Sequence, residues 1–449
     1  MMTDPLPIQP FTCEAKGQVQ IPGSKSITNR AMVLAALGHG ESLLSRCLFS
    51  EDTEIMGDAL RQLGIPVDSN ESQKTIRIQG TGRNWPVADA EIFVGNAGTA
   101  ARFLSAMLCL HPSGNYRLDG TKAMRKRPMQ GLIDALRKIG AKITCHEQEG
   151  LFPFTLETHG LNGGVWDVDA KQSSQILSAL LMVAPMAGGD VEVALDGGTV
   201  SQPFITMTVE MMRGFGVNIK GDGLSGTKIL HGQSYQPTRH SWKVEPDATA
   251  ASYFMSLPLV VGGKIILPGL HLDMLQGDIG FEAVLRKAGA IPSFTGEGME
   301  STGPTGQILG GKHDFNAISD TFLTLAAIAP LFEGPTFIRG IGHTRRQETD
   351  RIHAMATELR RLGQHVNETS DSIEIVPDRK ALQAKASEGV TLETYEDHRV
   401  AMSFGILGCR DLRNNGSAWL RLNNPGCCAK TFPDFFEILE NLRQSSMEA

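Results

Sequence analysis

The sequence predicts a mixed α/β (α+β) fold of six repeated units grouped in two domains. Three observations support it. A helix-like phrase ending in glycine recurs along the chain, a second type of helix start recurs with the same period, and short apolar runs typical of strands lie between them. The period is about 75 residues, so six units account for the 449 residues.

The first recurring element is a helix that ends at a glycine. In the phrases ALRQLG, ALRKIG, MMRGFG, VLRKAG and ELRRLG, apolar residues recur at helical spacing, and glycine is the residue expected just beyond a helix C-terminus. The closing glycines are Gly64, Gly140, Gly216, Gly289 and Gly363. A sixth helix of this kind is expected in the apolar run FFEILENL, near residue 437.

A second set of helices is predicted to begin at small or polar residues, near Ser26, Thr99, Ser174, Thr249, Thr321 and His398. Strand-like runs lie between the two helix types: TIRIQG, YRLDG, KIILPG, TFIRG and WLRLNN. One such unit cannot bury both faces of its elements, so several must pack together. The size limit of a single core favours two domains of three units each, with a break near residues 242–244.

Composition excludes several classes of protein. With 42 basic against 49 acidic residues and a net charge of -7, the chain lacks the basic surplus of a general nucleic-acid binder. The longest apolar stretches, such as residues 176–183, are too short to cross a bilayer. The start MMTDPLPIQP has neither the basic nor the apolar region of a signal peptide, so we expect a cytoplasmic protein.

The seven cysteines are scattered and include no C-x-x-C motif. A disulfide framework and a structural zinc site are therefore not expected, and free thiols are typical of a reducing cytoplasm. Cys427 and Cys428 are adjacent and could be redox-active, although buried thiols usually act as small hydrophobic groups.

Candidate ligand-binding residues stand at the starts of the second helix type. PGSKSITNR (22–30) places Lys25 at a helix N-terminus, where free N–H groups favour an anion, although an ordinary capped helix with a surface lysine is an equal alternative. GNAGTAAR (95–102) offers a close backbone approach at Gly98, or simply a flexible turn. In KQSSQ (171–175), helix capping alone is the likelier role of the hydroxyls. TVSQPF (199–204) is a similar segment, with Ser201 before the unit's second helix.

Basic and acidic residues cluster at further helix starts. The run MRKRPM is most simply a solvated face, whereas RRQETDR mixes cations with Glu348, EDHR opens the sixth unit's first helix, and NPGCCAKT contributes Lys430. Asp320 occupies the same place in the fifth unit, where helix capping, with Ser319 as a rival cap, is the alternative. Cations and hydroxyls at corresponding helix starts predict a positive cleft for two small anionic substrates, at least one a phosphate. Asp320 and Glu348 would remain for proton transfer.

The motifs PGSKSITNR, GNAGTAAR, KRPM, SSQILSALLMVAP, QETDRIHAMATELR, DHRVAMSFG and AKTFPDFFEIL resemble the EPSP synthase family, 3-phosphoshikimate 1-carboxyvinyltransferases, from about Gly17 to Leu442. The resemblance implies transfer of the enolpyruvyl group of phosphoenolpyruvate to the 5-hydroxyl of shikimate 3-phosphate, with release of phosphate, in the shikimate pathway. It also implies two domains, each of three βαβαββ units in an inside-out α/β barrel. Residues 1–22 with 244–449 would form domain 1, and residues 23–243 domain 2.

Roles are carried over from the resemblance residue by residue. Asp320, Glu348 and Lys25 would be catalytic, with Asp320 as proton acceptor and Glu348 as a candidate for proton exchange at the methylene carbon. The residues implied for shikimate 3-phosphate are Lys25, Ser26, Arg30, Ser173, Ser174, Gln175, Ser201, Asp320 and Gln347. Those implied for phosphoenolpyruvate are Lys25, Asn96, Gly98, Thr99, Arg127, Gln175, Arg351, Arg399 and Lys430.

Two positions depart from the family pattern: Gln347 stands where lysine is common, and Phe204 stands where tyrosine is frequent. The nearest rival is the sister enzyme that loads UDP-N-acetylglucosamine, but it uses a cysteine in a mobile loop, and the matching segment 121–128 contains none. An RNA-binding scaffold is a rival of another class, against which the net charge weighs. We expect a monomer with two small-molecule substrates and no metal, organic cofactor, nucleic acid or membrane.

Overall fold

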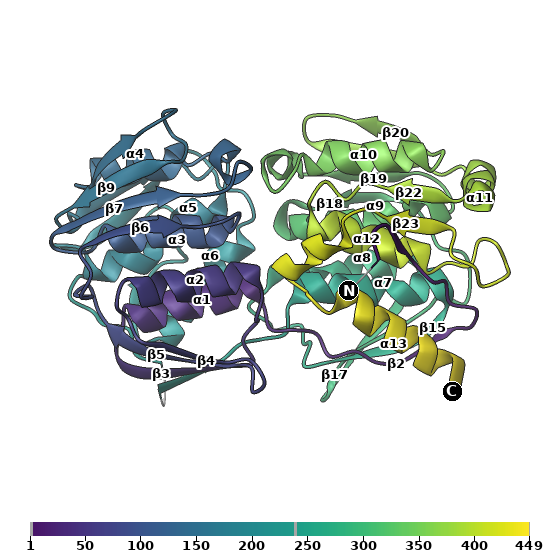
Figure 1. Cartoon of the computed structure of the whole chain (residues 1–449), viewed down its shortest axis with the longest axis horizontal. Helices are drawn as coiled ribbons and strands as arrows, with labels where there is room; N and C mark the ends of the chain where they lie inside the picture. Colours follow the sequence, from purple (N-terminus) through teal and green to yellow (C-terminus); the bar gives the residue numbers. More distant parts are fainter. Residues whose placement is uncertain (1–2, 238–239, 449) are drawn as a thin grey trace. The chain divides into compact units, whose positions relative to one another are not determined.

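The computed structural model describes residues 3–237 and 240–448. The chain folds into two compact units, one made of residues 1–22 and 246–449 (unit 1) and one of residues 23–245 (unit 2) (Figure 1). The chain therefore passes between the units twice, at residues 22–23 and 245–246. The break predicted after residue 243 lies two residues before the second of these points.

The second repeat of unit 2 shows how each repeat is built. It runs β6 (Asp89–Phe93), α3 (Gly98–Leu108), β7 (Gly114–Asp119), η1 (Met124–Lys126), α4 (Gln130–Lys138), β8 (Lys142–Cys145) and β9 (Phe154–Thr158). The sheet order is β6-β7-β9-β8; the first two strands are parallel, and β9 is antiparallel to both of its neighbours. This is a βαβαββ unit, because the long crossover through α3 permits parallel pairing and the short β8–β9 connection makes a hairpin.

The other repeats of unit 2 follow the same plan. The third runs β10 (Gly164–Val168), α5 (Ser174–Val183), η2 (Ala184–Met186), β11 (Val191–Leu195), α6 (Pro203–Gly214), β12 (Ile219–Lys220) and β13 (Lys228–Ile229). The first runs α1 (Lys25–Ala36), β3 (His39–Ser45), α2 (Glu51–Gln62), β4 (Val67–Asn70) and β5 (Thr75–Thr81). Its first strand comes from the end of the unit, since β14 (Ser241–Lys243) pairs parallel to β3.

In unit 1 the N-terminal segment supplies two strands, β2 to the sheet of the first repeat and β1 to that of the third. The first repeat runs β2 (Ala15–Gln18), α7 (Ala248–Val261), β15 (Gly263–Pro268), η4 (Gly277–Gly280), α8 (Phe281–Ala288), β16 (Ile291–Thr295) and β17 (Gly298–Thr302). The second runs β18 (Lys312–Asp314), η5 (Asn316–Thr321), α9 (Phe322–Ile328), η6 (Ala329–Leu331), β19 (Thr336–Arg339), η7 (Gly342–Arg346), α10 (Arg351–Arg361), β20 (His365–Glu368) and β21 (Ser372–Val376). α11 (Arg379–Glu388) leads into the third repeat, which runs β22 (Val390–Leu392), α12 (His398–Gly408), β23 (Leu420–Leu422), η8 (Pro425–Lys430) and α13 (Phe435–Glu448). The N-terminal strand β1 (Leu6–Pro7) pairs with β23 and completes the sheet of this repeat.

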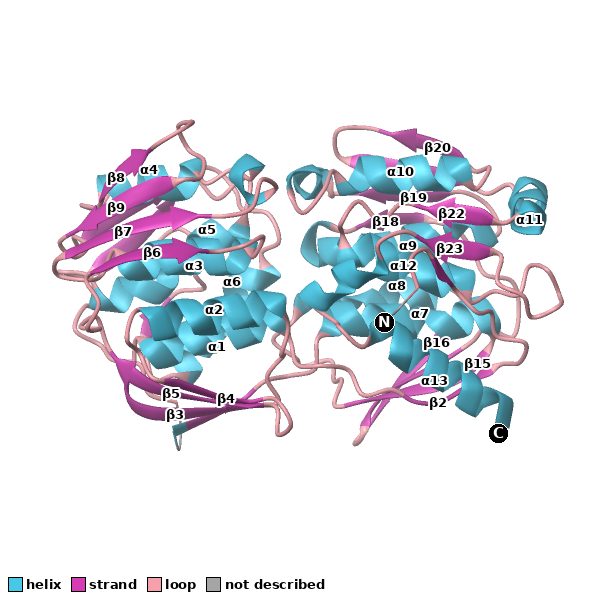
Figure 2. Cartoon of the chain, in the orientation of Figure 1, coloured by secondary structure: helices cyan, strands magenta, loops and turns pink. Residues whose placement is uncertain are grey.

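Within each unit most helices lie inside and the sheets outside, although α11 and α13 lie at the outer edge of unit 1 (Figure 2). In unit 1, α7, α9 and α12 pack against one another. Every residue of α9 and α12 is buried, whereas α8 buries only the face that carries Phe281, Val284, Leu285 and Ala288. The first helix of each repeat is therefore a core element, and the second is amphipathic. This is the inside-out arrangement expected from the resemblance.

The periodic pattern predicted the helix boundaries closely. The first helices begin within one residue of the predicted starts, for example α1 at Lys25 and α12 at His398. The five closing glycines follow α2, α4, α6, α8 and α10, and all have left-handed φ angles: 80° at Gly64, 113° at Gly140, 88° at Gly216, 113° at Gly289 and 80° at Gly363. Among the described residues, no helix is both long and apolar enough to span a bilayer.

Candidate functional site

Arg351 lies at the centre of a buried ion cluster in unit 1. It is the first residue of α10, and its side chain is 2% exposed. The guanidinium donates to Asp320 at 3.0 Å, to Glu348 at 2.9 Å and to Asp397 at 2.7 Å. It also donates to the side-chain oxygen of Gln347. One cation thus holds three carboxylates and an amide from three segments of unit 1: η5, the connection between η7 and α10, and the N-cap of α12.

Two further cations extend this cluster. Arg399, at the start of α12, contacts Asp320 at 2.8 Å, and Lys430, at the end of η8, contacts Glu348 at 3.1 Å. Asp320 and Glu348, predicted for proton transfer, are therefore each held between two cations. Burial alone would lower the pKa of Arg399, but the surrounding carboxylates, Asp320 foremost, raise it well above its ordinary value.

Asp320 is not a helix cap, which was the alternative interpretation of this residue. The N-cap of α9 is Thr321, and it makes no side-chain capping bond. Ser319, the rival cap, instead shares a 2.9 Å hydrogen bond with Nε2 of His343. Both carboxylate oxygens of Asp320 accept from arginines, so the geometry assigns Asp320 to the ion cluster.

Lys25 forms the corresponding ionic contact in unit 2. Its ammonium lies 3.3 Å from Asp52, and the two side chains are 13% and 3% exposed. Ser24 caps α1 by accepting from the Ile27 N–H, so Lys25 and half-buried Ser26 stand in the first turn of the helix. Asp52, in the first turn of α2, was not predicted from the sequence. The pair places a cation at a helix N-terminus, where the helix dipole favours an anion.

Arg30 is built into the packing of unit 2. It is 1% exposed and donates to Thr208 at 2.8 Å and to Ser178 at 3.1 Å. The rings of Phe103 and Phe204 lie 5.1 Å and 5.9 Å from its guanidinium carbon. Burial lowers the pKa of Arg30 to about 9. Most of its donors are already used by the protein, and its predicted contact with shikimate 3-phosphate stays a prediction.

The starts of α3 and α5 are linked around Gly98. The Arg127 guanidinium donates to the Asn96 carbonyl at 3.4 Å and lies so close to Gly98 that a methyl group there would sit 2.6 Å from Nη2. Gln175 donates to the Thr99 hydroxyl at 3.5 Å. The side-chain oxygen of Gln175 accepts from Arg102 at 3.2 Å. Arg102 is a buried residue of the GNAGTAAR motif, and the sequence pattern assigned it no role.

The predicted serines lie at two loop ends of the third repeat. Ser173 is the N-cap of α5 and accepts from the Gln175 N–H at 3.3 Å, so the capping interpretation is correct for this residue. Ser174 and Ser201 are buried, and Ser201 has a left-handed φ of 52°. Such a conformation is uncommon for serine and costs backbone energy that the surrounding structure must offset.

The basic run 124–129 is divided between surface and interior. Arg125 forms a surface ion pair with Glu147 at 2.6 Å and also contacts Asp119. Lys126 is exposed, whereas Arg127 is buried. The solvated-face interpretation therefore holds for the first two cations and not for Arg127.

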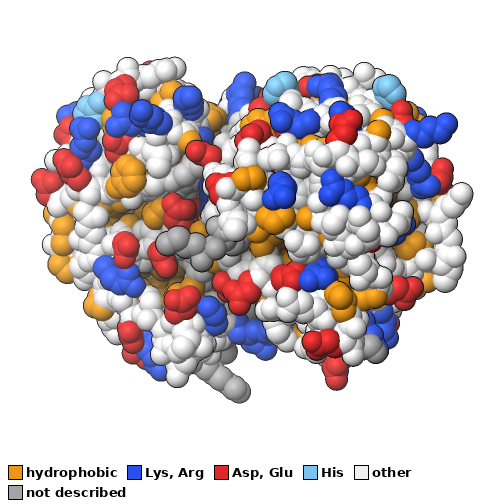
Figure 3. All heavy atoms as spheres, turned by 45° about the vertical axis from the view of Figure 1, so that its right-hand side comes forward, with side chains coloured by type: hydrophobic (Ala, Val, Ile, Leu, Met, Phe, Trp, Pro, Cys, Tyr) orange, Lys and Arg blue, Asp and Glu red, His pale blue; other side chains and the backbone are white. Residues whose placement is uncertain are grey.

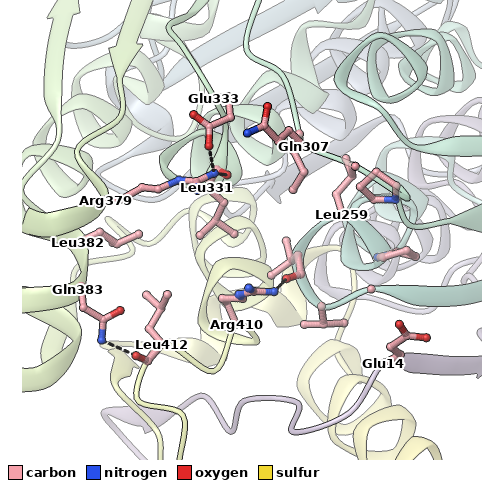
Figure 4. A pocket seen from close by; sticks show the side chains of 17 residues that line it. Glu14, Leu259, Gln307, Leu331, Glu333, Arg379, Leu382, Gln383, Arg410 and Leu412 are labelled. Atoms are coloured by element: carbon pink, nitrogen blue, oxygen red, sulfur yellow. Dashed lines mark hydrogen bonds and ion pairs between the residues drawn. The ribbon is translucent and has the colours of Figure 1, made fainter.

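A cavity lies elsewhere in unit 1, where α7, α9 and α12 end (Figure 4). It has a volume of about 580 Å³ and a mixed lining, in which Leu259, Leu331 and Leu382 are among the apolar residues. Arg379, on its wall, pairs with Glu333 at 2.9 Å, and Arg410 donates to the Val260 carbonyl at 3.0 Å. Its arginines are thus committed to protein partners, and no predicted site residue lines it.

Comparisons with known proteins agree over nearly the whole chain. The family model of EPSP synthase (3-phosphoshikimate 1-carboxyvinyltransferase) matches residues 12–439. A 3-phosphoshikimate 1-carboxyvinyltransferase of Opitutus terrae is 50% identical over 99% of both chains, and one of Nostoc punctiforme is 43% identical over 94% of this chain and 96% of its own. The solved EPSP synthase of Acinetobacter baumannii superposes with a TM-score of 0.77 at 25% identity over 97% of both chains. The enolpyruvyl transferase NikO of Streptomyces tendae, at 16% identity and a TM-score of 0.72 over 97% of this chain and 96% of its own, shares the fold.

Proposed function

The chain belongs to the EPSP synthase family, and from this premise we propose that it transfers the enolpyruvyl group of phosphoenolpyruvate to the 5-hydroxyl of shikimate 3-phosphate. The products are 5-enolpyruvylshikimate 3-phosphate and phosphate. The observation that carries this proposal is the ion cluster of unit 1, in which Asp320 and Glu348 are each held between two cations. Such a cluster supplies both anion contacts and proton-transfer groups.

Phosphoenolpyruvate carries a carboxylate and a phosphate, and forked guanidinium groups bind both well. In this proposal Arg351, Arg399 and Lys430 contribute contacts from unit 1. Lys25, Arg127, Gln175 and the α3 start at Asn96, Gly98 and Thr99 contribute contacts from unit 2. Each of these unit 1 cations is already paired with a carboxylate, so the substrate must share or displace an existing ion pair. Binding is therefore expected to weaken as salt is added.

Shikimate 3-phosphate presents a phosphate, a carboxylate and hydroxyl groups. The proposed contacts for these groups are Lys25, Ser26, Arg30, Ser173, Ser174, Gln175, Ser201, Asp320 and Gln347. Hydroxyls and main-chain N–H groups at the starts of α1 and α5 suit a phosphate, because a helix N-terminus carries partial positive charge. Asp320 accepts from two arginines, and in this proposal it also takes the proton of the 5-hydroxyl.

The proposed reaction proceeds through a tetrahedral adduct. Glu348, with Lys430 beside it, delivers a proton to the methylene carbon of phosphoenolpyruvate, and the adjacent carbon becomes electrophilic. The 5-hydroxyl oxygen bonds to that carbon as Asp320 takes its proton. The carbon–oxygen bond to phosphate then breaks, a methyl proton returns to Glu348, and the double bond is restored. The proton on Asp320 passes to the departing phosphate or to water, which returns both carboxyl groups to their starting states. Lys25 and Lys430 stabilise the charge that develops on the departing phosphate.

Substrate choice tests this function. Phosphate release from phosphoenolpyruvate is expected with shikimate 3-phosphate and not with UDP-N-acetylglucosamine. On the face shown in Figure 3, Lys and Arg side chains are interspersed with Asp and Glu side chains, which does not favour an RNA-binding surface. Phosphate release with UDP-N-acetylglucosamine alone would overturn the proposal in favour of the sister activity.

We further propose that the enzyme acts as a monomer in the cytoplasm. All seven cysteines are free, which is typical of a reducing compartment. Sedimentation equilibrium of the purified chain tests the first part, and a mass near that of a dimer would contradict it.

Gly98→Ala is expected to weaken binding at the phosphoenolpyruvate site. The added methyl would meet the Arg127 guanidinium at 2.6 Å, so the arginine, as the flexible partner, must move. Displacing a charge-assisted contact should raise the KM for phosphoenolpyruvate about tenfold. Glyphosate, which inhibits the family at this site, should lose affinity for the same reason. Steady-state inhibition measures both effects.

The matched control for this change is Gly296→Ala, because a methyl at Gly296 would meet nothing within 4 Å. Its KM and glyphosate inhibition should equal those of the parent. If glyphosate inhibits the parent and Gly98→Ala equally, Arg127 does not contribute to that site.

Gln347→Lys is expected to make the protein less stable without ligand and more responsive to shikimate 3-phosphate. Gln347 accepts from Arg351, so a lysine there removes an acceptor and places an ammonium beside a guanidinium. The loss should be about 1 kcal/mol in the free energy of unfolding. A bound phosphate would relieve the repulsion, so affinity for shikimate 3-phosphate should rise modestly, and less at high salt. Calorimetric titration at two salt concentrations and denaturant unfolding measure the two effects.

Exposed Arg346 is the alternative contact at this place. If Gln347→Lys leaves the affinity for shikimate 3-phosphate unchanged while Arg346→Ala lowers it, the predicted role of Gln347 is wrong.

A further inference from the structure

A buried carboxyl group of unit 1, Asp278, has no part in the reaction described above. It belongs to η4, which packs against η5, the segment that carries Asp320, and against α7. Asp278 is 4% exposed, and its Oδ2 accepts from the Thr249 hydroxyl at 3.0 Å. Its Oδ1 has no hydrogen-bond partner among the described residues. An ionised carboxylate in this position lacks full solvation, so the charged state is costly.

The charges that face Asp278 come from three elements. Asp320 approaches from η5, Asp247 from the N-cap of α7, and Arg399 from α12. The following helix, α8, has its own pair, Arg286 with Glu282 at 3.1 Å. Burial, followed by repulsion from Asp320, raises the pKa of Asp278 to about 7, and Arg399 and the Thr249 hydrogen bond oppose the rise. Asp278 therefore changes charge close to neutral pH.

Resting on the proposed function, we propose that Asp278 is a positioning residue whose charge controls, by repulsion between the two carboxyl groups, how strongly Asp320 holds a proton. The repulsion between the two carboxyl groups is reciprocal, so a charge on Asp278 favours the protonated form of Asp320 as much as the reverse. With Asp278 neutral, Arg399 stabilises the Asp320 carboxylate and makes it a weak base. With Asp278 ionised, its charge repels the Asp320 carboxylate, and Asp320 becomes a stronger acceptor for the 5-hydroxyl proton.

The pH profile of kcat tests this inference. At saturating substrates the parent kcat should rise about 3–10-fold between pH 6 and pH 8, with a midpoint near the pKa of about 7. Asp278→Asn should abolish this rise and hold kcat near the parent's value at pH 6, while KM for either substrate changes less than kcat. Asp273→Asn removes an exposed carboxylate from the same loop and should retain the rise. Retention of the rise in Asp278→Asn, or its absence from the parent, would overturn the inference.

Thr249→Val provides a second variant that keeps the carboxyl group. The Thr249 hydrogen bond lowers the pKa of Asp278, so its loss should move the midpoint of the kcat profile to higher pH by about 0.5–1 unit. A merely structural role of Asp278 would not move this midpoint. A midpoint that stays in place would overturn the inference.

Stability against pH separates this inference from the proposed function. The pKa of Asp278 is raised on folding, so its contribution to stability is fully present at low pH and is lost as pH rises through about 7. Asn has no such loss, and the Tm of Asp278→Asn minus that of the parent should increase between pH 5 and pH 8. An absence of phosphate release would contradict the proposed function, but the Tm difference can be measured in that case as well. A pH-independent difference would overturn the inference whatever the kinetics.

Discussion

Replacing Asp320 by asparagine is expected to lower kcat by about 10²-fold or more, the usual scale for losing a positioned acid or base. Asparagine keeps the shape of the side chain but cannot take the hydroxyl proton. The chain should stay folded, because Arg351 retains Glu348 and Asp397 as partners. Phosphate release at saturating substrates measures kcat, and calorimetric titration with shikimate 3-phosphate should show a smaller loss of affinity.

Asp314→Asn is the control for this change. Asp314 stands at the end of β18, is exposed and pairs with Arg339 at 3.2 Å, so its replacement should leave kcat unchanged within about twofold. Near-normal turnover of Asp320→Asn would show that Asp320 only holds Arg351 and Arg399 in place.

Arg351→Met is expected to reduce the free energy of unfolding by about 3–5 kcal/mol, the cost of removing one partner of a buried ion pair. Asp397 is fully buried and Glu348 is 8% exposed, so both would remain in the interior without their central cation. Activity should fall with stability, because Asp320 would also lose one of its two arginines. Denaturant unfolding of the purified variant gives the free-energy difference.

A matched substitution exists close to this site. Arg345 also binds two carboxylates, Asp350 at 2.7 Å and Glu368 at 3.0 Å, but its side chain is 23% exposed. Water can replace these contacts in part, so Arg345→Met should cost about 1 kcal/mol. Equal losses in the two variants would contradict the buried-cluster explanation.

Local sequence signals were sufficient to predict most of the helices. A glycine such as Gly289 adopts a left-handed φ at low cost, so the end of α8 could be identified from sequence. The strands that open the first repeat of each unit, β14 and β2, could not be identified from the sequence, because they come from distant parts of the chain. Ser241–Lys243 pair with Leu43–Ser45, and a three-residue edge strand carries no signal that identifies so distant a partner.

Some residues of the candidate site were predicted and others were missed, because the sequence does not show which buried side chains contact each other. Arg351 and Arg399 stand at helix starts, where the sequence pattern draws attention to cations, and Lys430 ends η8, before the last apolar helix. Asp278, Asp397 and Asp52 were missed because each looks like an ordinary helix-start acid until its buried partner is known. Arg30 lies inside α1, and the sequence pattern did not reveal that Thr208 and Ser178 bind its guanidinium. Its contact with shikimate 3-phosphate stays a prediction.

The N-terminal segment has a consequence for biosynthesis. β2 pairs with β15, and β1 pairs with β23 close to the other end of the chain. At a translation rate of about 5–20 residues per second, unit 2 emerges whole and can close all three of its sheets while β1 and β2 still lack their partners. The ribosome-bound intermediate therefore carries a folded unit 2 behind two unpaired strands, which are exposed to chaperones or to other nascent chains until unit 1 has been synthesised.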